Sequence, residues 1–112
     1  MSRPNSLRVF VVENHADTLR FMQRYFQNMG HQVQTAPDMT TALAQLPHAD
    51  IDLLICDIGL PDGDGWELMT RLGSDHKFLA VAMSGYGDNA DKAKSRAAGY
   101  RHHLLKPLLP DD

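Results

Sequence analysis

Short apolar runs alternate with segments of helical periodicity along this chain, and the alternation is the strongest constraint on its fold. Five runs have strand character, and they cover residues 7–12, 31–36, 52–57, 78–83 and 100–105. Three of these carry few polar residues, which is typical of strands buried on both faces, whereas the second alternates and is expected nearer an edge. Helical spacing fills the intervals over residues 16–29, 39–46, 66–72 and 89–98. We predict a doubly wound α/β domain, with a parallel sheet covered on both faces by four helices.

The composition fits one domain and excludes several classes of protein. The chain has 112 residues, of which 43% are apolar, so we expect a single domain over 1–112 with a tail at 1–6 and a short stub at 108–112. A net charge of −3 argues against direct binding to nucleic acid. Cys56 is the single cysteine and is expected in the core, and no apolar run approaches the ~20 residues of a membrane span. We therefore expect a cytoplasmic protein with no membrane contact.

Polar side chains stand where the predicted strands end. Glu13 and Asn14 follow the first strand, Asp57 closes the third, Ser84 follows the fourth and Lys106 follows the fifth. The carboxyl ends of parallel strands meet at one edge of the sheet, where doubly wound folds bind ligands. We therefore expect these five side chains to converge in one crevice.

The residue types in this crevice suit phosphoryl chemistry. Two carboxylates and an amide oxygen are hard ligands of the kind that Mg²⁺ prefers. Lys106 and Ser84 can bind phosphoryl oxygens through an ammonium and a hydroxyl. Asp57, beside a metal and an ammonium, can act as a nucleophile toward phosphorus and form an aspartyl phosphate.

The motifs at these strand ends resemble those of the receiver domain of two-component response regulators, the CheY-like family. The resemblance covers residues 7–107. Its carriers are Val-Val-Glu at 11–13, Leu-Ile-Cys-Asp at 54–57, Leu-Pro-Asp-Gly-Asp-Gly at 60–65, Met-Ser-Gly at 83–85 and Leu-Lys-Pro at 105–107. The resemblance implies a flavodoxin-like sheet of order 2-1-3-4-5 and a signalling switch rather than a turnover enzyme.

The resemblance also implies roles for individual residues. Asp57 would accept a phosphoryl group from a histidine kinase or a histidine phosphotransfer protein, and the switched face would then meet a downstream protein partner. Ser84 and Lys106 would hold the phosphoryl oxygens, and the backbone carbonyl of Gly59 would be a metal ligand. The bond before Pro107 would be cis, as in many members of the family.

Asn14 departs from the family pattern, which has a second acid at this position. An amide oxygen can coordinate Mg²⁺, but the site loses one negative charge. We therefore expect Mg²⁺ to bind more weakly than in a receiver with two acids. The alternative is an atypical pseudo-receiver that acts as a phosphorylation-independent protein-interaction module.

His103 is the second departure, since many family members carry a tyrosine or phenylalanine three residues before the lysine. One interpretation makes His103 a switch residue that works with Ser84. The other makes it a half-exposed strand histidine without a switching role. Both stay open at this point, and we expect ordinary surface roles for the other histidines.

The first predicted helix has a wider apolar arc than a helix lying on a sheet needs. Phe21 and Tyr25 form the surplus edge of this arc. After Pro107 only residues 108–112 follow, so the family's fifth helix is expected to be missing or truncated, which would expose apolar sheet beside the first helix. We predict a homodimer or partner docking through the first-helix face.

Overall fold

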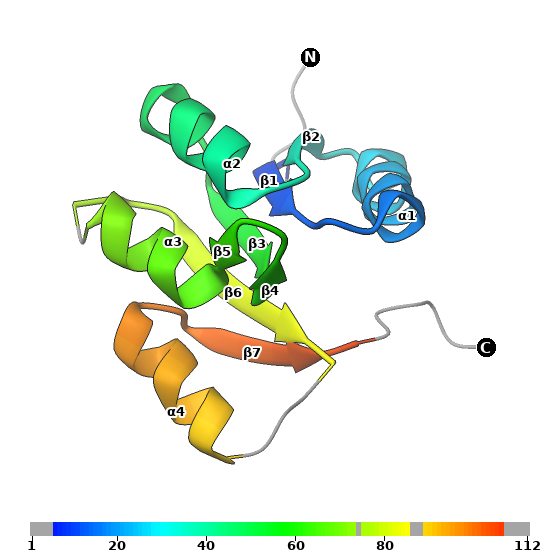
Figure 1. Ribbon diagram of the computed structural model, residues 1–112. Coiled ribbons are helices and arrows are strands. Elements are labelled where there is room, and N and C mark those ends of the chain that lie inside the picture. Colours follow the sequence, from blue (N-terminus) through cyan, green and yellow to red (C-terminus); the bar gives the residue numbers. More distant parts are fainter. Residues whose placement is uncertain (1–5, 74, 86–88, 107–112) are drawn as a thin grey trace.

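The computed structural model describes residues 6–73, 75–85 and 89–106, with side chains from 91 onward in the last range. Its main sheet has five parallel strands in the order β2-β1-β3-β6-β7 (Figure 1). The strands are β1 (Arg8–Val12), β2 (Gln32–Ala36), β3 (Leu53–Asp57), β6 (Leu79–Ser84) and β7 (His102–Leu105). This order is 2-1-3-4-5 along the chain when these five strands alone are counted, so the predicted doubly wound fold is confirmed.

Helices cover the sheet on both sides. They are α1 (Ala16–Asn28), α2 (Met39–Gln45), α3 (Gly65–Leu72) and α4 (Asn89–Ala98). Figure 1 shows α1 on one face of the sheet and α2, α3 and α4 together on the opposite face. No helix in the described part of the chain is long and apolar enough to cross a membrane.

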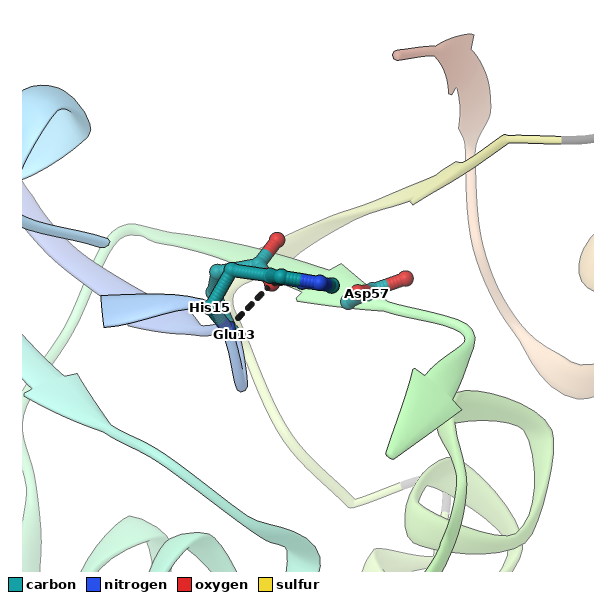
Figure 2. A group of neighbouring side chains, drawn as sticks. All are labelled: Glu13, His15 and Asp57. Atoms are coloured by element: carbon teal, nitrogen blue, oxygen red, sulfur yellow. Dashed lines mark hydrogen bonds and ion pairs between the residues drawn. The ribbon is translucent and has the colours of Figure 1, made fainter. Parts of the chain in front are cut away.

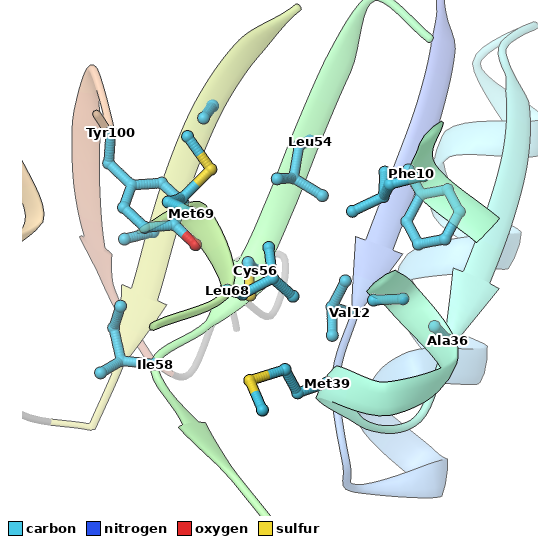
Figure 3. Close-up of a cluster of buried hydrophobic side chains, with 14 of the residues drawn as sticks. Phe10, Val12, Ala36, Met39, Leu54, Cys56, Ile58, Leu68, Met69 and Tyr100 are labelled. Atoms are coloured by element: carbon cyan, nitrogen blue, oxygen red, sulfur yellow. The ribbon is translucent and has the colours of Figure 1, made fainter. Parts of the chain in front are cut away.

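The strands divide their side chains between two cores because successive residues point to opposite faces. In β1, Phe10 and Val12 enter the core under α2 and α3, whereas Val9 and Val11 enter the core under α1. The first core is the larger one and extends to Tyr100 (Figure 3). This arrangement explains why the central strands are apolar at nearly every position.

The connection between β3 and α3 contains a small antiparallel hairpin of β4 (Gly59–Leu60) and β5 (Gly63–Asp64). At the tip of this hairpin Asp62 accepts hydrogen bonds from the backbone N–H groups of Met39 and Thr40, both at 2.8 Å. The aspartate thereby ties the hairpin to the start of α2, whose first-turn N–H groups lack helical partners.

Asp64 and Asp38 cap the helices that follow them. Asp64 Oδ1 accepts from the N–H of Glu67 at 2.7 Å, and Asp38 Oδ1 accepts from the N–H of Thr41 at 2.7 Å. The helix α2 ends at Gln45, before Pro47. A short 3-10 helix, η1 (Leu46–His48), follows it and contains this proline. Proline is accepted in a first turn, where its missing N–H has no partner to lose.

Arg8, Asp50 and Asp52 form a cluster at the amino edge of the sheet, which we call the amino-edge triad. The Arg8 guanidinium binds both oxygens of Asp52, at 3.0 and 3.2 Å, and also contacts Asp50. The backbone N–H of Arg8 donates to Asp52 as well, at 2.8 Å. The triad clamps the start of β1 to the start of β3, and its hydrogen bonds from Arg8 lower the pKa of Asp52.

Several predictions concern the ends of the chain and the first helix. Ser6, assigned above to the tail, donates a hydrogen bond to the Gly30 carbonyl at 2.9 Å. On α1, Tyr25 is 45% exposed and stacks on the partly buried Phe21. The cis bond before Pro107 and the missing fifth helix concern residues outside the described ranges, and both stay predictions.

Candidate functional site

The carboxyl ends of β1, β3, β6 and β7 open into a crevice of about 530 Å³. Asp57, Ser84 and Lys106 line it directly, and His15 and Trp66 contribute to its walls. Glu13 lies immediately beside these residues, fully buried beneath the rim. The structure therefore brings together four of the five strand-end residues that the sequence predicted to converge.

Glu13, Asp57 and Lys106 form the charged centre of the crevice, which we call the carboxyl-edge triad. The Lys106 ammonium lies 2.7 Å from Glu13 Oε1 and 2.7 Å from Asp57 Oδ2. Asp57 is 5% exposed and Glu13 is 0% exposed. The other Asp57 oxygen, Oδ1, accepts from the backbone N–H of Gly59 at 3.1 Å. One ammonium thus neutralises part of the charge of two adjacent buried carboxylates.

Burial and charge move the three pKa values in different ways. Burial raises the pKa of Asp57, and the neighbouring Glu13 charge raises it further, so the opposing effect of Lys106 is outweighed. Burial also acts to raise the pKa of Glu13, but hydrogen bonds from Lys106 and the His15 backbone hold it below its usual value. The pKa of Lys106 is raised, because its contacts with Asp57 and Glu13 outweigh its partial burial. The lysine is therefore an ammonium at neutral pH.

His15 joins this site, although sequence reasoning did not single it out. Its backbone N–H and its ring Nδ1 approach Glu13 Oε2, at 2.9 and 3.2 Å. One potential ligand atom from each of Glu13, His15 and Asp57 lies within 4.8 Å of the others (Figure 2). The side chain of Asn14 is exposed. The backbone bends at Asn14, and this bend brings His15 back to the Glu13 carboxylate.

Ser84 and His103 meet on the other side of the crevice. Ser84 Oγ lies 2.8 Å from His103 Nε2, and His103 Nδ1 lies 2.8 Å from Ser95 Oγ on α4. Ser95 Oγ in turn accepts a hydrogen bond from Trp66 Nε1 on α3 at 2.9 Å. His103 and Ser84 are therefore hydrogen-bonded neighbours, and the switching role of His103 stays a prediction. Sequence reasoning missed Ser95 and Trp66; the available signal was a small polar residue on the buried side of an alanine-rich helix.

A family model described as the response regulator receiver domain matches residues 9–112 of this sequence. The chain belongs to this family. The resemblance inferred from the strand-end motifs is therefore confirmed. Because the receiver is a module of two-component systems, the chain is assigned to that class of signalling protein.

Relatives of known sequence and structure agree with this assignment. The regulatory protein VanRc of Enterococcus gallinarum is 30% identical over 105 residues, which are 94% of this chain but 46% of that protein. The receiver thus spans about half the length of this relative. CheY4 of Vibrio cholerae has the same fold, with a TM-score of 0.87 at 23% identity, over 95% of this chain and 91% of that one.

A third similar structure is the receiver domain of Ssk1 from Saccharomyces cerevisiae, solved together with the histidine phosphotransfer protein Ypd1. Its TM-score is 0.85 at 18% identity, over 93% of this chain and 81% of that one. At this identity the likeness concerns the fold alone. It shows that the shape of this receiver is shared with one that was crystallised with a phosphotransfer protein.

Two buried residues fix the backbone around Asp57 in this receiver. Gly65 packs so closely that an added Cβ would lie 3.0 Å from the Asp57 carbonyl oxygen and 2.9 Å from Ile58 Cδ1. Tyr100 donates its hydroxyl hydrogen to the Gly65 carbonyl at 2.7 Å. Cys56, next to Asp57 in the sequence, lies in the core as predicted, and burial raises the pKa of its thiol to about 12. The thiol is therefore protonated and unreactive at neutral pH.

Proposed function

We propose that this receiver accepts a phosphoryl group on Asp57 from a histidine kinase or a histidine phosphotransfer protein. The observation that carries the proposal is the buried Asp57 carboxylate, which shares the Lys106 ammonium with Glu13 at 2.7 Å on each side. A carboxylate oxygen of Asp57 forms a bond to phosphorus while the bond from phosphorus to the donor's imidazole nitrogen breaks. The imidazole leaves with that electron pair, and the product is an acyl phosphate.

Lys106 and Ser84 then have distinct tasks. The ammonium lies against Asp57 Oδ2 and supplies positive charge where negative charge accumulates on the transferring group. The Ser84 hydroxyl lines the same crevice and can donate to a phosphoryl oxygen. Burial and the Glu13 charge already make negative charge costly at Asp57, so the positive charge of Lys106 is needed where the acyl phosphate places its charged oxygens.

The residues present also fit a divalent cation. Glu13 and Asp57 are adjacent buried carboxylates with only one ammonium between them, so a further positive charge is electrostatically favourable. Glu13, Asp57, the Gly59 carbonyl and Asn14 would hold Mg²⁺, and the His15 imidazole offers a nitrogen ligand at the same place. Bound Mg²⁺ would offset the charge of the phosphoryl oxygens. The exposed amide of Asn14 supports the weaker affinity proposed above.

The test is phosphorylation of the intact chain by acetyl phosphate with Mg²⁺, followed by intact mass. We expect one added phosphoryl group on the wild type and none on Asp57→Asn. A wild type that gains no mass from acetyl phosphate, and none from a panel of phosphorylated histidine kinases, would overturn the proposal. Turnover is not part of this function: the proposed chemistry is one self-catalysed transfer and the later hydrolysis of the acyl phosphate.

The second candidate is a pseudo-receiver that binds its partner without phosphorylation. Asn14 favours it, because the second acid of the family pattern is replaced by a neutral amide. In that case beryllofluoride with Mg²⁺ would leave the spectrum of the protein unchanged. Asp57→Asn would then bind the downstream protein as tightly as the wild type does.

The α1 face is the proposed route to self-association. Tyr25 on α1 is 45% exposed and Met29, directly after this helix, is 51% exposed, and Leu79 and Leu104 are exposed on β6 and β7. Leu104 is the register partner of Met83, and Met83 belongs to the core under α1, so these apolar groups share one side of the sheet. A dilute sample that stays monomeric in light scattering would contradict a homodimer.

We propose the cytoplasm as the location, because the lone buried Cys56 suits a reducing compartment.

A further inference from the structure

Four side chains from four elements form a continuous hydrogen-bonded path that ends at the phosphoryl crevice. It begins at the indole of Trp66 on α3, passes through Ser95 on α4 and His103 on β7, and reaches Ser84 at the end of β6. The three links measure 2.9, 2.8 and 2.8 Å in that order. We call this path the indole–serine relay.

The first link sets the direction of the others. An indole N–H can only donate, so Ser95 Oγ is the acceptor from Trp66. In the described part of the chain, Trp66 and His103 are the partners that the structure gives to Ser95 Oγ. With Trp66 Nε1 at one acceptor position, the arrangement that also uses the single hydroxyl hydrogen of Ser95 directs it to His103 Nδ1.

The imidazole passes this direction on. When Nδ1 accepts, the neutral ring carries its hydrogen on Nε2, and Nε2 donates to Ser84 Oγ. Ser84 then accepts from His103, and its own hydroxyl hydrogen is directed to another acceptor. The opposite tautomer would make Ser84 donate to the ring, and it would turn that hydrogen away from the crevice.

We propose that Ser95 and Trp66 are positioning residues that act through His103, and that they hold the Ser84 hydroxyl as a donor for the phosphoryl group on Asp57. This proposal rests on the proposed function, because it assigns the relay to the same phosphoryl site. It also replaces the two open interpretations of His103 with a defined task. In this proposal His103 is not a strand histidine without a role, and its task is not limited to switching. Its imidazole fixes the direction of the hydrogen bond between α4 and Ser84.

Burial makes the direction persistent. Ser95 is 1% exposed and Ser84 is 6% exposed, so water cannot easily replace either link. A buried hydroxyl or imidazole nitrogen that loses its partner pays its full desolvation cost, which favours the fully connected path. The indole is held in turn by Lys94, whose ammonium lies 4.3 Å from the centre of the ring.

The first experiment reads the tautomer of His103 directly, by nitrogen chemical shifts of the imidazole in the uniformly ¹⁵N-labelled full chain. His103→Gln assigns the signals. We expect a protonated Nε2 and an unprotonated Nδ1 in the wild type. A protonated Nδ1, alone or together with Nε2, would overturn the proposal.

The second experiment asks whether Ser95 and Trp66 act on phosphorylation through this tautomer. Ser95→Ala should change the His103 nitrogen shifts and slow phosphorylation by acetyl phosphate about tenfold, since one aligned hydrogen bond has about that effect. Ser95→Thr keeps the hydroxyl and should restore both readouts. Trp66→Phe keeps an aromatic ring under Lys94 but removes the N–H, and should shift the signals in the same sense.

Thr70→Ala is the matched control, because Thr70 donates a hydroxyl hydrogen to the Trp66 carbonyl on the same helix without belonging to the relay. It should change neither readout. If acetyl phosphate phosphorylates both Ser95→Ala and Trp66→Phe at the wild-type rate, the relay has no positioning role. A wild type that is never phosphorylated would overturn the proposed function and with it the phosphoryl role of the relay, while the imidazole signals would still show whether Ser95 sets the tautomer.

Discussion

The amino-edge triad and the carboxyl-edge triad have the same formal composition, one cation and two carboxylates, and they stand at opposite ends of β1 and β3. At the amino edge the pKa of Asp52 is lowered, and at the carboxyl edge the pKa of Asp57 is raised. Both aspartates touch a cation, so contact with a positive group does not explain the difference. Exposure does: the Asp52 side chain is 36% exposed, whereas the Asp57 side chain is 8% exposed.

The choice of cation adds to this contrast. The planar guanidinium of Arg8 binds both oxygens of Asp52, so neither carboxylate oxygen is left without a cationic donor. The ammonium of Lys106 is a point charge that touches a single oxygen of Asp57. The amino-edge triad is a saturated clamp, and the carboxyl-edge triad keeps oxygens and charge available for chemistry.

The largest difference should appear when each triad loses its cation. Lys106→Met is expected to slow phosphorylation by acetyl phosphate by about 100-fold or more, because a preorganised positive group is removed from the transferring phosphoryl group. Arg8→Met should leave the phosphorylation rate within about twofold of wild type. Arg8 lies at the opposite end of the sheet from Asp57, and salt screens the interaction between charges so far apart. Rates are read by intact mass over time. Equal losses in the two variants would show that the triads do not differ in the way proposed.

The next largest difference between the two triads should appear in the affinity for Mg²⁺. Asn14→Asp adds a charge beside the carboxyl-edge triad and should tighten Mg²⁺ binding about tenfold, a fraction of the upper bound for two charges ~4 Å apart. Trp66 lines the crevice, so its fluorescence can follow the titration. Asp50→Asn removes a charge from the amino-edge triad and should leave the affinity unchanged. An Asn14→Asp protein that binds Mg²⁺ no better than wild type would contradict the assignment of position 14 to the metal site.

The parts of this structure that follow from strand periodicity were predictable. Val9 to Val12 are apolar at every position because β1 is buried on both faces, and that pattern alone indicates a central parallel strand. Once the strands are parallel, their carboxyl ends share an edge, so the meeting of Glu13, Asp57 and Lys106 follows from topology. Their roles in phosphorylation remain predictions.

The parts that depend on how helices pack could not be read in the same way. Ser95 and Trp66 lie 29 residues apart and meet only because α3 and α4 lie side by side, which periodicity does not specify. The tie from Asp62 to the start of α2 likewise spans 22 and 23 residues and depends on the hairpin before α3. His15 was missed for a local reason, because its contact with Glu13 depends on a backbone turn and not on a side-chain pattern.

Removing one carboxylate from each triad should change stability in opposite directions at neutral pH. The raised pKa of Asp57 means that the folded state holds this proton more tightly than the unfolded state does. The free energy of unfolding therefore falls as the pH rises from the unfolded value of about 3.8 through the raised folded value, and Asp57→Asn should raise the urea midpoint at pH 7. Asp52 has the lowered pKa, so its charge contributes stability above the unfolded value that is lost as the pH falls through the folded one. Asp52→Asn should accordingly lower the midpoint at pH 7.

The smallest effect is the response of these two stability changes to salt. The Debye length falls from about 10 Å at 0.1 M to about 3 Å at 1 M, and this screening acts mainly on exposed charges. The decrease caused by Asp52→Asn should therefore shrink when urea unfolding at pH 7 is repeated at about 1 M sodium chloride. The increase caused by Asp57→Asn should persist, because its source is the burial of a carboxylate beside Glu13, and dissolved salt screens buried charges much less than exposed ones. A salt response of the same size in both variants would mean that the carboxyl-edge triad is open to solvent, and the proposed cause of the raised Asp57 pKa would then be wrong.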